Sequence, residues 1–341
     1  MTANLYFAKN QTGAELKVSI IIPVRGYNQY LKECLAKIHC QSYPNYEIII
    51  ISDQAIGIND HDLSPDLQVI VPDQLLNPSA KRDLGVKASA GAIIAFIDDD
   101  AYPDPDWLKN ALKLFEDNDI AAVGGPGLDP PEDSFWQKIG GKILAAKLAS
   151  GSESYRNQKK PRRFVNDYPS FNFLIRRDIF MELGGFDYEY WRGEDTKLCL
   201  KIINWGGKIL YDPEVIVYHH KRAFLAPHLQ QLWKCSLYRG FFAKIDPKIS
   251  GNFKFFVPSL FLLGLILGTI FLIFDLHGKI LFLGIFTVYF LLLLFEIIKT
   301  KSFKDGLFLM IGIFLTHLTY GAGFITGLLS GTRQMKAKVY Q

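Results

Sequence analysis

Three long stretches without an acidic or basic side chain other than one histidine, all in the last third of the chain, constrain the fold most. They run from Phe255 to Phe274, from Ile280 to Phe295 and from Gly306 to Leu329, and the third contains His317. Each is near the roughly 20 apolar residues that a helix needs to cross a bilayer. Three such stretches are hard to bury in one soluble core. We therefore expect a soluble part followed by about three transmembrane helices.

The charges around these stretches bear on orientation. The N-terminal residues have no basic segment followed by an apolar core, so we expect no secretory signal. The soluble part should then face the cytoplasm, with the chain held as a multi-pass protein of the cytoplasmic membrane. Three crossings place the lysines of residues 299–304 inside, as the positive-inside rule requires, but the basic residues at 333–338 outside. A re-entrant segment stays open as an alternative.

The charge balance excludes one class of partner. The chain has 38 Lys and Arg against 34 Asp and Glu, and the resulting net charge of +4 comes without a continuous basic stripe. Such a surface is too weakly basic for nucleic acid, so we expect none as a partner. The 4 cysteines form no CxxC pair, which is typical of free thiols in a reducing compartment.

The first hundred residues have the pattern of an α/β fold. Short apolar runs rich in β-branched residues predict buried strands at 18–22, 46–52, 67–71 and 92–97. Helical periodicity begins near Asn28, after the first run, and again from Ser79 to Ala88, before the fourth. Strands that alternate with helices predict a mostly parallel sheet.

The next segments continue this pattern. The motif "PDPDWLKNALKLF" predicts a helix with Asp104 as its cap and Pro105 in its first turn. Residues 120–127 predict a strand with a glycine-rich turn, and residues 170–187 predict a strand, a helix and a second such turn. The polar and basic stretch from Ser150 to Arg163 predicts a mobile loop.

Polar residues follow the predicted strands at their carboxyl ends, where ligands bind in open α/β sheets. These residues are Pro23 and Arg25 after the first strand, Asp53 after the second, and Asp98, Asp99 and Asp100 after the fourth. No GxGxxG follows a strand and no Walker A lysine loop is present, so the sequence gives no support for a dinucleotide site or an ATPase.

The stretch "FIDDDAYPD" is a candidate cation site. Asp98 and Asp100, one residue apart on an extended turn, can face the same cavity and favour a hard divalent cation, Mg²⁺ or Mn²⁺, that holds phosphates. Acids after a strand also form turns and cap helices, so both interpretations stay open for this triplet alone.

A second acidic group lies in "WRGEDTKLCLKI". Glu194 and Asp195 stand at the start of a predicted helix, where acids favour the helix dipole. A carboxylate close to a bound sugar phosphate can also take the proton from an attacking hydroxyl. Trp191 beside them either stacks on a sugar ring or packs in the core.

Three segments together resemble the family 2 inverting glycosyltransferases of the GT-A type. They are "VSIIIPVRGYNQYLKECLAKIHCQSYPNYEIIIISD", "NPSAKRDLGVKASAGAIIAFIDDDAYPDPDWL" and "LGGFDYEYWRGEDTKLCLKIINWGGKILYDPEVIVYHHKR". The resemblance covers about residues 17 to 240, in order and with matching spacing. It implies a GT-A, Rossmann-like fold and a nucleotide-sugar donor.

The resemblance also implies roles for single residues. Pro23, Asp53 and Arg82 match donor-binding positions. Asp98 and Asp100 match the DXD motif, with Asp100 as the metal ligand and Asp98 as a ribose or metal contact. Asp195 matches the catalytic base with Glu194 beside it, and His219 matches a metal or phosphate contact. Arg25 and Asp99, next to these positions, are also expected to bind the donor. A phosphate motif of the QxxRW type is not intact, since only Tyr238, Arg239 and Gly240 stand near its place. This favours transfer of a single sugar over a processive polymerase, with Trp191 and Arg239 as acceptor or phosphate contacts.

The function that follows is a membrane-anchored, metal-dependent, inverting hexosyltransferase of polysaccharide or glycan biosynthesis. Its partners would be a UDP-, GDP- or dTDP-sugar, a lipid-linked or glycan acceptor, and the membrane. Two alternatives stay open: a polyprenyl-phosphate sugar synthase and an inactive membrane scaffold of a glycan-assembly complex. The domains expected on this basis are an N-terminal extension (1–16), a nucleotide-sugar-binding half (17–125), an acceptor-binding and catalytic half (126–225), an amphipathic membrane-surface segment (226–254), a transmembrane region (255–329) and a tail (330–341).

Overall fold

The structure, a computed structural model, describes residues 16–57, 66–186, 193–274, 276–300, 302–332 and 335. The chain forms two compact units, the first made of Met1–Gly127 with Lys159–His219 and the second of Leu128–Gln158 with His220–Gln341. The domain boundaries given above remain predictions.

An eight-stranded sheet forms the centre of the first unit, in the order β3-β2-β1-β4-β9-β6-β10-β8. Pairs β3/β2, β2/β1, β1/β4 and β6/β10 are parallel, whereas β9 and β8 are antiparallel to their neighbours. The predicted, mostly parallel sheet is therefore present. Its strands are β1 Val18–Val24, β2 Tyr46–Ser52, β3 Leu67–Ile70, β4 Ile93–Ile97, β6 Ile120–Gly124, β8 Arg163–Val165, β9 Asn172–Arg176 and β10 Lys208–Tyr211.

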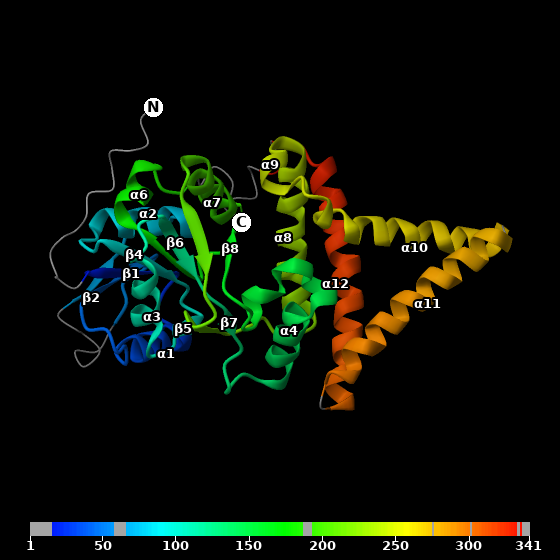
Figure 1. Cartoon of the computed structure of the whole chain (residues 1–341), viewed down its shortest axis with the longest axis horizontal. Coiled ribbons are helices and arrows are strands. Elements are labelled where there is room, and N and C mark those ends of the chain that lie inside the picture. The colour runs from blue at the N-terminus through cyan, green and yellow to red at the C-terminus, as the bar shows by residue number, and fades with distance from the viewer. Residues whose placement is uncertain are drawn as a thin grey trace. The chain divides into compact units, whose positions relative to one another are not determined.

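Alternation along the strands determines which helices cover each face (Figure 1). Ile20 and Ile22 of β1 share a core cluster with helices α1 (Gln29–Ile38) and α3 (Trp107–Leu114). Ile21 points the other way, toward Gly85 of α2 (Pro78–Ala88), where a Cβ would lie 2.6 Å from its side chain. Because β1 is buried on both faces, all of its residues except Ser19 are apolar, and this made the strand recognisable in the sequence.

The order of the strands sets the position of the ligand site. Along the chain, β2 and β3 are added on one side of β1, and β4 is then added on its other side. This reversal between β1 and β4 is the switch point at which open α/β sheets bind ligands, at the carboxyl ends of the strands. A smaller sheet has the strand order β5-β11-β7. Its strands are β5 Ala101–Pro103, β11 Val217–His219 and β7 Gly127–Leu128, and β5 follows β4 closely in the sequence.

Two local predictions are wrong. Helix α3 begins at Trp107 rather than near Pro105, because the Asp104 side chain accepts the Asp106 N–H in a turn that precedes the helix. The stretch predicted as a loop, Ser150 to Arg163, begins in helices: Ser150 ends α5 (Lys147–Ser150), and residues 151–157 form the 3₁₀ helix η1 (Gly151–Asn157). Glu153 and Arg156, which are one turn apart in η1, form an ion pair of 2.6 Å that stabilises this helix. The remaining first-unit helices are α6 (Arg177–Glu182) and α7 (Glu194–Trp205).

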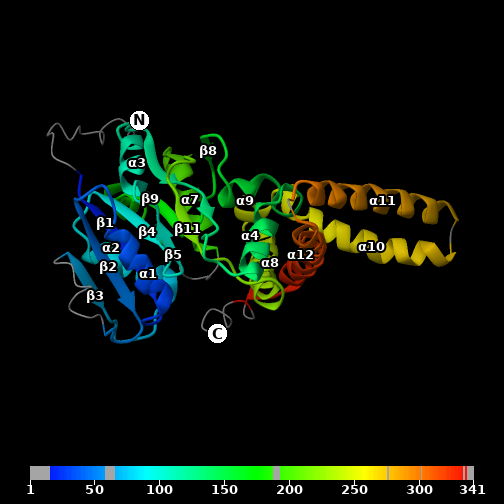
Figure 2. The same cartoon turned by 90° about the horizontal axis from the view of Figure 1, so that it is seen from below.

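The second unit is helical (Figure 2). Its helices are α4 Phe135–Ala145, α5, η1, α8 Ala226–Ile245, α9 Pro247–Ser250, η2 Phe253–Phe255, α10 Val257–Phe274, α11 Leu276–Ile298 and α12 Phe303–Leu329. By length and composition, α11 and α12 can each cross a membrane, and α10 is a shorter apolar helix. The three uncharged stretches of the sequence thus correspond to α10, α11 and α12.

Candidate active site

Three predicted residues meet at the carboxyl edge of the main sheet. Asp98 follows β4, and Asp100 immediately precedes β5. His219 ends β11 and lies opposite Ala101 in the antiparallel β5/β11 pair, which brings its Nε2 to 3.2 Å from Oδ1 of Asp100. The ligand atoms of Asp98, Asp100 and His219 all lie within 4.8 Å of one another. The pairing of two short strands therefore joins residues that are more than a hundred positions apart.

These three side chains suit a divalent cation. Two carboxylates and one imidazole are a donor set that first-row divalent ions accept. The Nδ1 atom of His219 is buried without a hydrogen-bond partner among the described residues, and the Phe171 ring lies 4.8 Å from the imidazole. His219, whose ring orientation is restricted by Phe171, is thus a third candidate metal ligand beside Asp98 and Asp100.

Arg82 links this cluster to the second acidic group. The residue lies on α2 and is only 4% exposed, and its Nη2 donates to Oδ1 of Asp98 at 2.6 Å. Burial alone would lower the pKa of this guanidinium, but the carboxylates of Asp98 and of the Glu194–Asp195 pair outweigh burial and raise the pKa. Arg82 is therefore a fixed cation between two acidic groups.

Glu194 and Asp195 begin α7, as predicted. Glu194 is buried, and its carboxylate accepts the N–H of Gly193 at 2.8 Å. Burial and then the charge of Glu194 raise the pKa of Asp195 to about 7, although Arg82 and the hydrogen bonds from Ser170 oppose the rise. Asp195 Oδ1 has no hydrogen-bond partner among the described residues. A carboxylate with a raised pKa and a free oxygen is suited to accept a proton near neutral pH.

Asp53 is held by a lysine that the sequence analysis did not identify. Lys81 is 3% exposed, and its Nζ lies 2.7 Å from Asp53 Oδ2 and donates to the carbonyl of Val24 at 2.6 Å. Lys81 thus connects the carboxyl ends of β1 and β2. The second carboxylate oxygen of Asp53 has no partner among the described residues. The only signal in the sequence was the position of Lys81 next to Arg82 in "AKRDLG".

Asp99 has a different environment from its two neighbours. Its Oδ2 accepts a hydrogen bond of 2.7 Å from Asn28, the residue that also caps α1 through the N–H of Leu31. Burial raises the pKa of Asp99 to about 6, with the charges of Asp98 and Asp100 adding to the rise and Asn28 opposing it. The structure therefore ties Asp99 to the start of α1, and its predicted contact with a donor remains a prediction.

A further acid missed from the sequence anchors the chain before α7. Asp83 accepts the N–H of Phe186 at 3.0 Å, directly after the turn in which Gly184 and Gly185 have φ of 72° and 70°. A Cβ on Gly185 would lie 2.7 Å from the Asp83 carboxylate, so glycine is required there for two reasons. Trp191, the predicted sugar-stacking residue, lies outside the described residues.

The other predicted residues are distributed as follows. Pro23 is a buried member of β1 that lies opposite Ile51 of β2, and Arg25 follows β1 with an exposed side chain. Arg239 belongs to the second unit, on α8, where its guanidinium lies 4.6 Å from the Phe255 ring centre. Their predicted roles toward donor or acceptor remain predictions.

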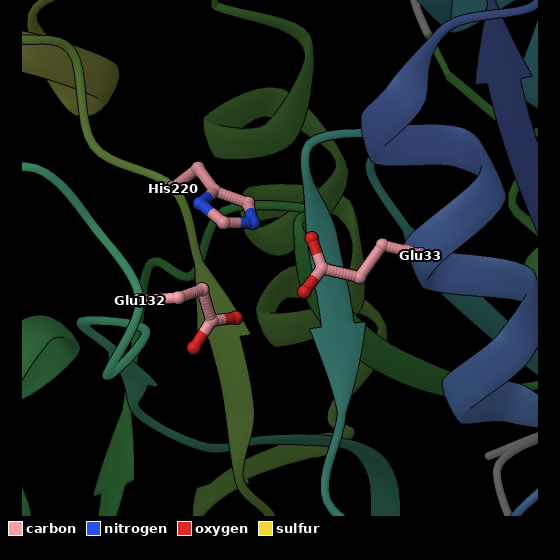
Figure 3. A group of neighbouring side chains, drawn as sticks. All are labelled: Glu33, Glu132 and His220. Carbon is pink, nitrogen blue, oxygen red and sulfur yellow. The ribbon is translucent and has the colours of Figure 1, made fainter.

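The two histidines of "VYHHKR" contact different carboxylates. Whereas His219 turns to Asp100, the buried His220 places its Nδ1 2.5 Å from Oδ1 of the equally buried Asp133. Figure 3 shows His220 and Glu132, an exposed residue of the loop before α4 whose carboxylate comes within 4.8 Å of the imidazole. The two adjacent histidines therefore belong to two different clusters of acidic side chains.

Comparison with known proteins gives the family. The model of the family "Glycosyl transferase family 2" matches residues 19–184, which contain the sheet edge, Lys81, Arg82 and the three aspartates. Residues 19–184 are therefore a domain of this family. Glycosyltransferase AglE of Haloferax volcanii is 25% identical over 215 residues, which cover 61% of this chain and 68% of that protein.

A second relative matches along almost the whole length of both chains. It is the Methanococcus voltae enzyme named dolichyl N-acetyl-alpha-D-glucosaminyl phosphate 3-beta-D-2,3-diacetamido-2,3-dideoxy-beta-D-glucuronosyltransferase, 23% identical over 338 residues, which cover 94% of this glycosyltransferase and 99% of the relative. Among solved structures, the mannosyltransferase PcManGT of Pyrobaculum calidifontis, in complex with GDP-Man and Mn²⁺, has a TM-score of 0.63 at 15% identity and covers 93% of this chain and 88% of its own. The predicted family and GT-A fold are therefore confirmed, and the chain is a glycosyltransferase.

Proposed function

We propose that this glycosyltransferase moves one sugar, with inversion, from a nucleotide-diphosphate donor to a hydroxyl of a lipid-linked glycan. The observation that carries the proposal is the placement of Arg82. This residue binds Asp98 of the cation cluster and lies close enough to Asp195 for each to shift the pKa of the other. A site for the leaving diphosphate and a candidate base thus meet at one cation.

Asp98, Asp100 and His219 would hold Mg²⁺ or Mn²⁺, and this ion would neutralise the charge that develops on the departing diphosphate. Mn²⁺ is present in the structure of the Pyrobaculum relative, which also contains GDP-Man. Arg82 would contribute a second positive charge to the same oxygens. Asp53, held by Lys81, has one carboxylate oxygen left over for the base or ribose of the donor.

Asp195 would act as the general base. The acceptor oxygen forms a bond to the anomeric carbon, the bond between that carbon and the phosphate oxygen breaks with its electron pair leaving on the diphosphate, and the hydroxyl proton passes to Asp195. The raised pKa of Asp195, about 7, favours this transfer at neutral pH. Attack from the face opposite the leaving group gives inversion.

The base also bears on the nature of the acceptor. A phosphate monoester is anionic at neutral pH and needs no base, whereas a sugar hydroxyl does. A glycan hydroxyl is therefore favoured over the lipid phosphate itself, which is the acceptor of a polyprenyl-phosphate sugar synthase. The Methanococcus relative, matched over 99% of its length, is named for a dolichyl-phosphate-linked sugar as its acceptor.

Membrane association follows from the same interpretation. Helices α11 and α12 are each long and apolar enough to cross a bilayer. A lipid-linked acceptor places its glycan at the membrane surface, so an enzyme held at that surface meets its acceptor by diffusion in two dimensions. We propose that the first unit faces the cytoplasm.

The test uses membranes that contain the full chain and a supplied pool of lipid-linked acceptor. Labelled UDP-, GDP- and dTDP-sugars are offered with Mn²⁺ or with EDTA, and label in solvent-extractable lipid is counted. We expect one donor to give incorporation that needs the metal and is lost in Asp195→Asn but kept in Asp119→Asn. Asp119 is a matched control because it is 61% exposed, pairs with Lys208 and precedes β6, at the opposite edge of the sheet.

Each other outcome has a defined meaning. Incorporation that survives Asp195→Asn and yields a sugar joined directly to the lipid phosphate would favour the synthase. No incorporation from any donor, with the acceptor pool demonstrated, would favour the inactive scaffold.

A further inference from the structure

We propose that only the α10–α11 hairpin crosses the bilayer, and that the paired helices α8 and α12 lie along the bilayer surface on the side of the glycosyltransferase domain. The proposal rests on the membrane association proposed above and specifies how the second unit meets the lipid. It concerns the surface of this unit and its partner, a lipid bilayer.

The two helices of the hairpin are apolar along almost their whole length, and many of these apolar side chains are exposed. On α11, the 18-residue window that is most apolar is only 11% buried. Its exposed apolar side chains extend along the whole helix and include Ile280, Leu281, Leu283, Ile285, Val288, Leu291, Leu292 and Phe295. A helix that is apolar all round, without protein to cover it, is suited to lipid rather than to water.

The dimensions and the charges of the hairpin also suit a bilayer. Helices of 18 and 23 residues extend about 27 and 35 Å, close to the roughly 30 Å of the hydrocarbon core. The exposed His277 and Lys279 lie in the first turn of α11, and the exposed Lys299 follows α11. Polar groups thus stand at both ends of the apolar part. In the sequence, three lysines in residues 299–304 follow the hairpin and one lysine, Lys279, lies at its far end, an excess on the side that the positive-inside rule favours.

Helix α12 has a different surface, although its length and composition pass the same test. Its most apolar window is 39% buried, and the largest exposures, at Phe303 and Leu329, are at its two ends. Between them, Leu307 and Ile311 are exposed four residues apart, on one side of the helix. One apolar stripe is typical of a helix that lies at an interface.

Helix α8 covers the opposite side of α12 from Thr316 to its C-terminal end. His228 and Thr316 meet near the start of the contact at 3.5 Å, and Lys244 donates to the carbonyl of Ser330 near its end, so the two helices run in the same direction. A Cβ on Gly327 would lie 2.0 Å from the carbonyl oxygen of Leu237, so the backbones approach closely. Figures 1 and 2 show α12 beside α8 and crosswise to the α10–α11 hairpin.

This pairing makes a crossing by α12 unfavourable. Gln230, Gln231 and Lys234 are exposed on α8 between the His228 and Ser236 contacts, so they lie beside the middle of α12. If α12 crossed the bilayer, α8 would be carried with it, and these polar side chains would face the hydrocarbon. A position along the surface leaves them in water or among lipid headgroups.

Two crossings also resolve the orientation conflict seen in the sequence. After α10 and α11 the chain has returned to its starting side, so the lysine-rich loop before α12 and the basic residues at 333–338 are both on the inside.

Cysteine accessibility in intact cells tests the proposal. The exposed native cysteines, Cys40 and Cys235, are changed to Ser, and one cysteine is introduced in three separate full-length variants: His277→Cys, Lys299→Cys and Thr332→Cys. Each variant is treated with a membrane-impermeant maleimide before or after permeabilisation. A control that keeps Cys40 alone reports the side of the glycosyltransferase domain.

We expect His277→Cys to be labelled fully in intact cells, and Lys299→Cys, Thr332→Cys and the Cys40 control to be labelled only after permeabilisation. Labelling of Thr332→Cys in intact cells would show a third crossing and overturn the proposal. Protection of His277→Cys in intact cells would overturn it as well, because the hairpin would then not reach the far side. Labelling requires no transferase activity, so this result is independent of the proposed reaction.

Discussion

Replacing Asp195 by Asn should abolish transfer and yet stabilise the protein. In the folded chain the pKa of Asp195 rises from its ordinary value of 3.8 to about 7, first because of burial and then because of Glu194. Ionisation of this side chain therefore opposes folding. The contribution of the protonated form is fully present below pH 3.8 and is lost as the pH rises through about 7. Asparagine has the same shape and no charge to bury.

The size of the gain follows from this shift. A rise from 3.8 to about 7 corresponds to about 4 kcal/mol of unfolding free energy above pH 7. Because the residue is partly exposed, solvent screening reduces this figure, and we expect about 2 kcal/mol. In thermal terms this is roughly 5 °C.

The assay is thermal unfolding of the full chain in one detergent with EDTA, at pH 6 and pH 8. We expect Asp195→Asn to melt above the wild type at pH 8 and to lose part of this advantage at pH 6. Asp119→Asn removes an exposed pair with Lys208 and should change Tm little at either pH. This prediction would be refuted if Asp195→Asn were no more stable than the wild type at pH 8, or if the difference in Tm between the two proteins were the same at pH 6 and pH 8. Either result would mean that burial and the charge of Glu194 do not disfavour ionised Asp195.

Three further experiments test the rest of the candidate site. In the wild type, kcat/KM should fall about tenfold per pH unit below about 7, because Asp195 must be unprotonated to act as base, and a flat profile down to pH 5 would contradict this role. His219→Ala should weaken Mn²⁺ binding about tenfold or more, read by titration calorimetry without donor, and unchanged affinity would remove His219 from the ligand set. Lys81→Met should raise KM for the donor with little change in kcat and cost about 2 kcal/mol of stability, because the Asp53 carboxylate loses its buried partner. The matched control, Lys87→Met, changes an exposed lysine of the same helix. Equal KM values in the two variants would contradict the role of Lys81.

The sequence predicted the features whose physical cause is local. Strand β1 was predicted at 18–22 because both of its faces are buried, so that four of these five residues are β-branched and apolar; the strand itself continues to Val24. Helix α1 was readable because Leu31, Cys34, Leu35 and Ile38 fall on one face after the Asn28 cap. The position of the catalytic edge followed from the same strands, since polar residues at their carboxyl ends lie together in any parallel sheet.

Partners brought together by folding were not readable in the same way. Lys81 reaches both Asp53 and the Val24 carbonyl only because α2 packs across β1 and β2, so nothing near Lys81 in the sequence indicated a buried charge. The contact of Asp99 with Asn28 connects residues 71 positions apart. The family resemblance supplied the position of His219, and the β5/β11 pairing supplies the physical reason for it.

The membrane part shows the same limit in another form. A hydropathy criterion uses the length and composition of a helix, and both α11, with a mean hydropathy of 2.5, and α12, with 1.7, meet it. Whether a helix is buried depends on other segments of the chain. Helix α12 is partly buried by α8, and the two backbones come close together because Gly240, Gly323 and Gly327 have no side chains. Since α8 carries polar residues on its outer side, the pair cannot enter lipid as freely as α11 can. The number of crossings therefore depends on burial within the second unit, and a count of apolar stretches gives only its upper bound.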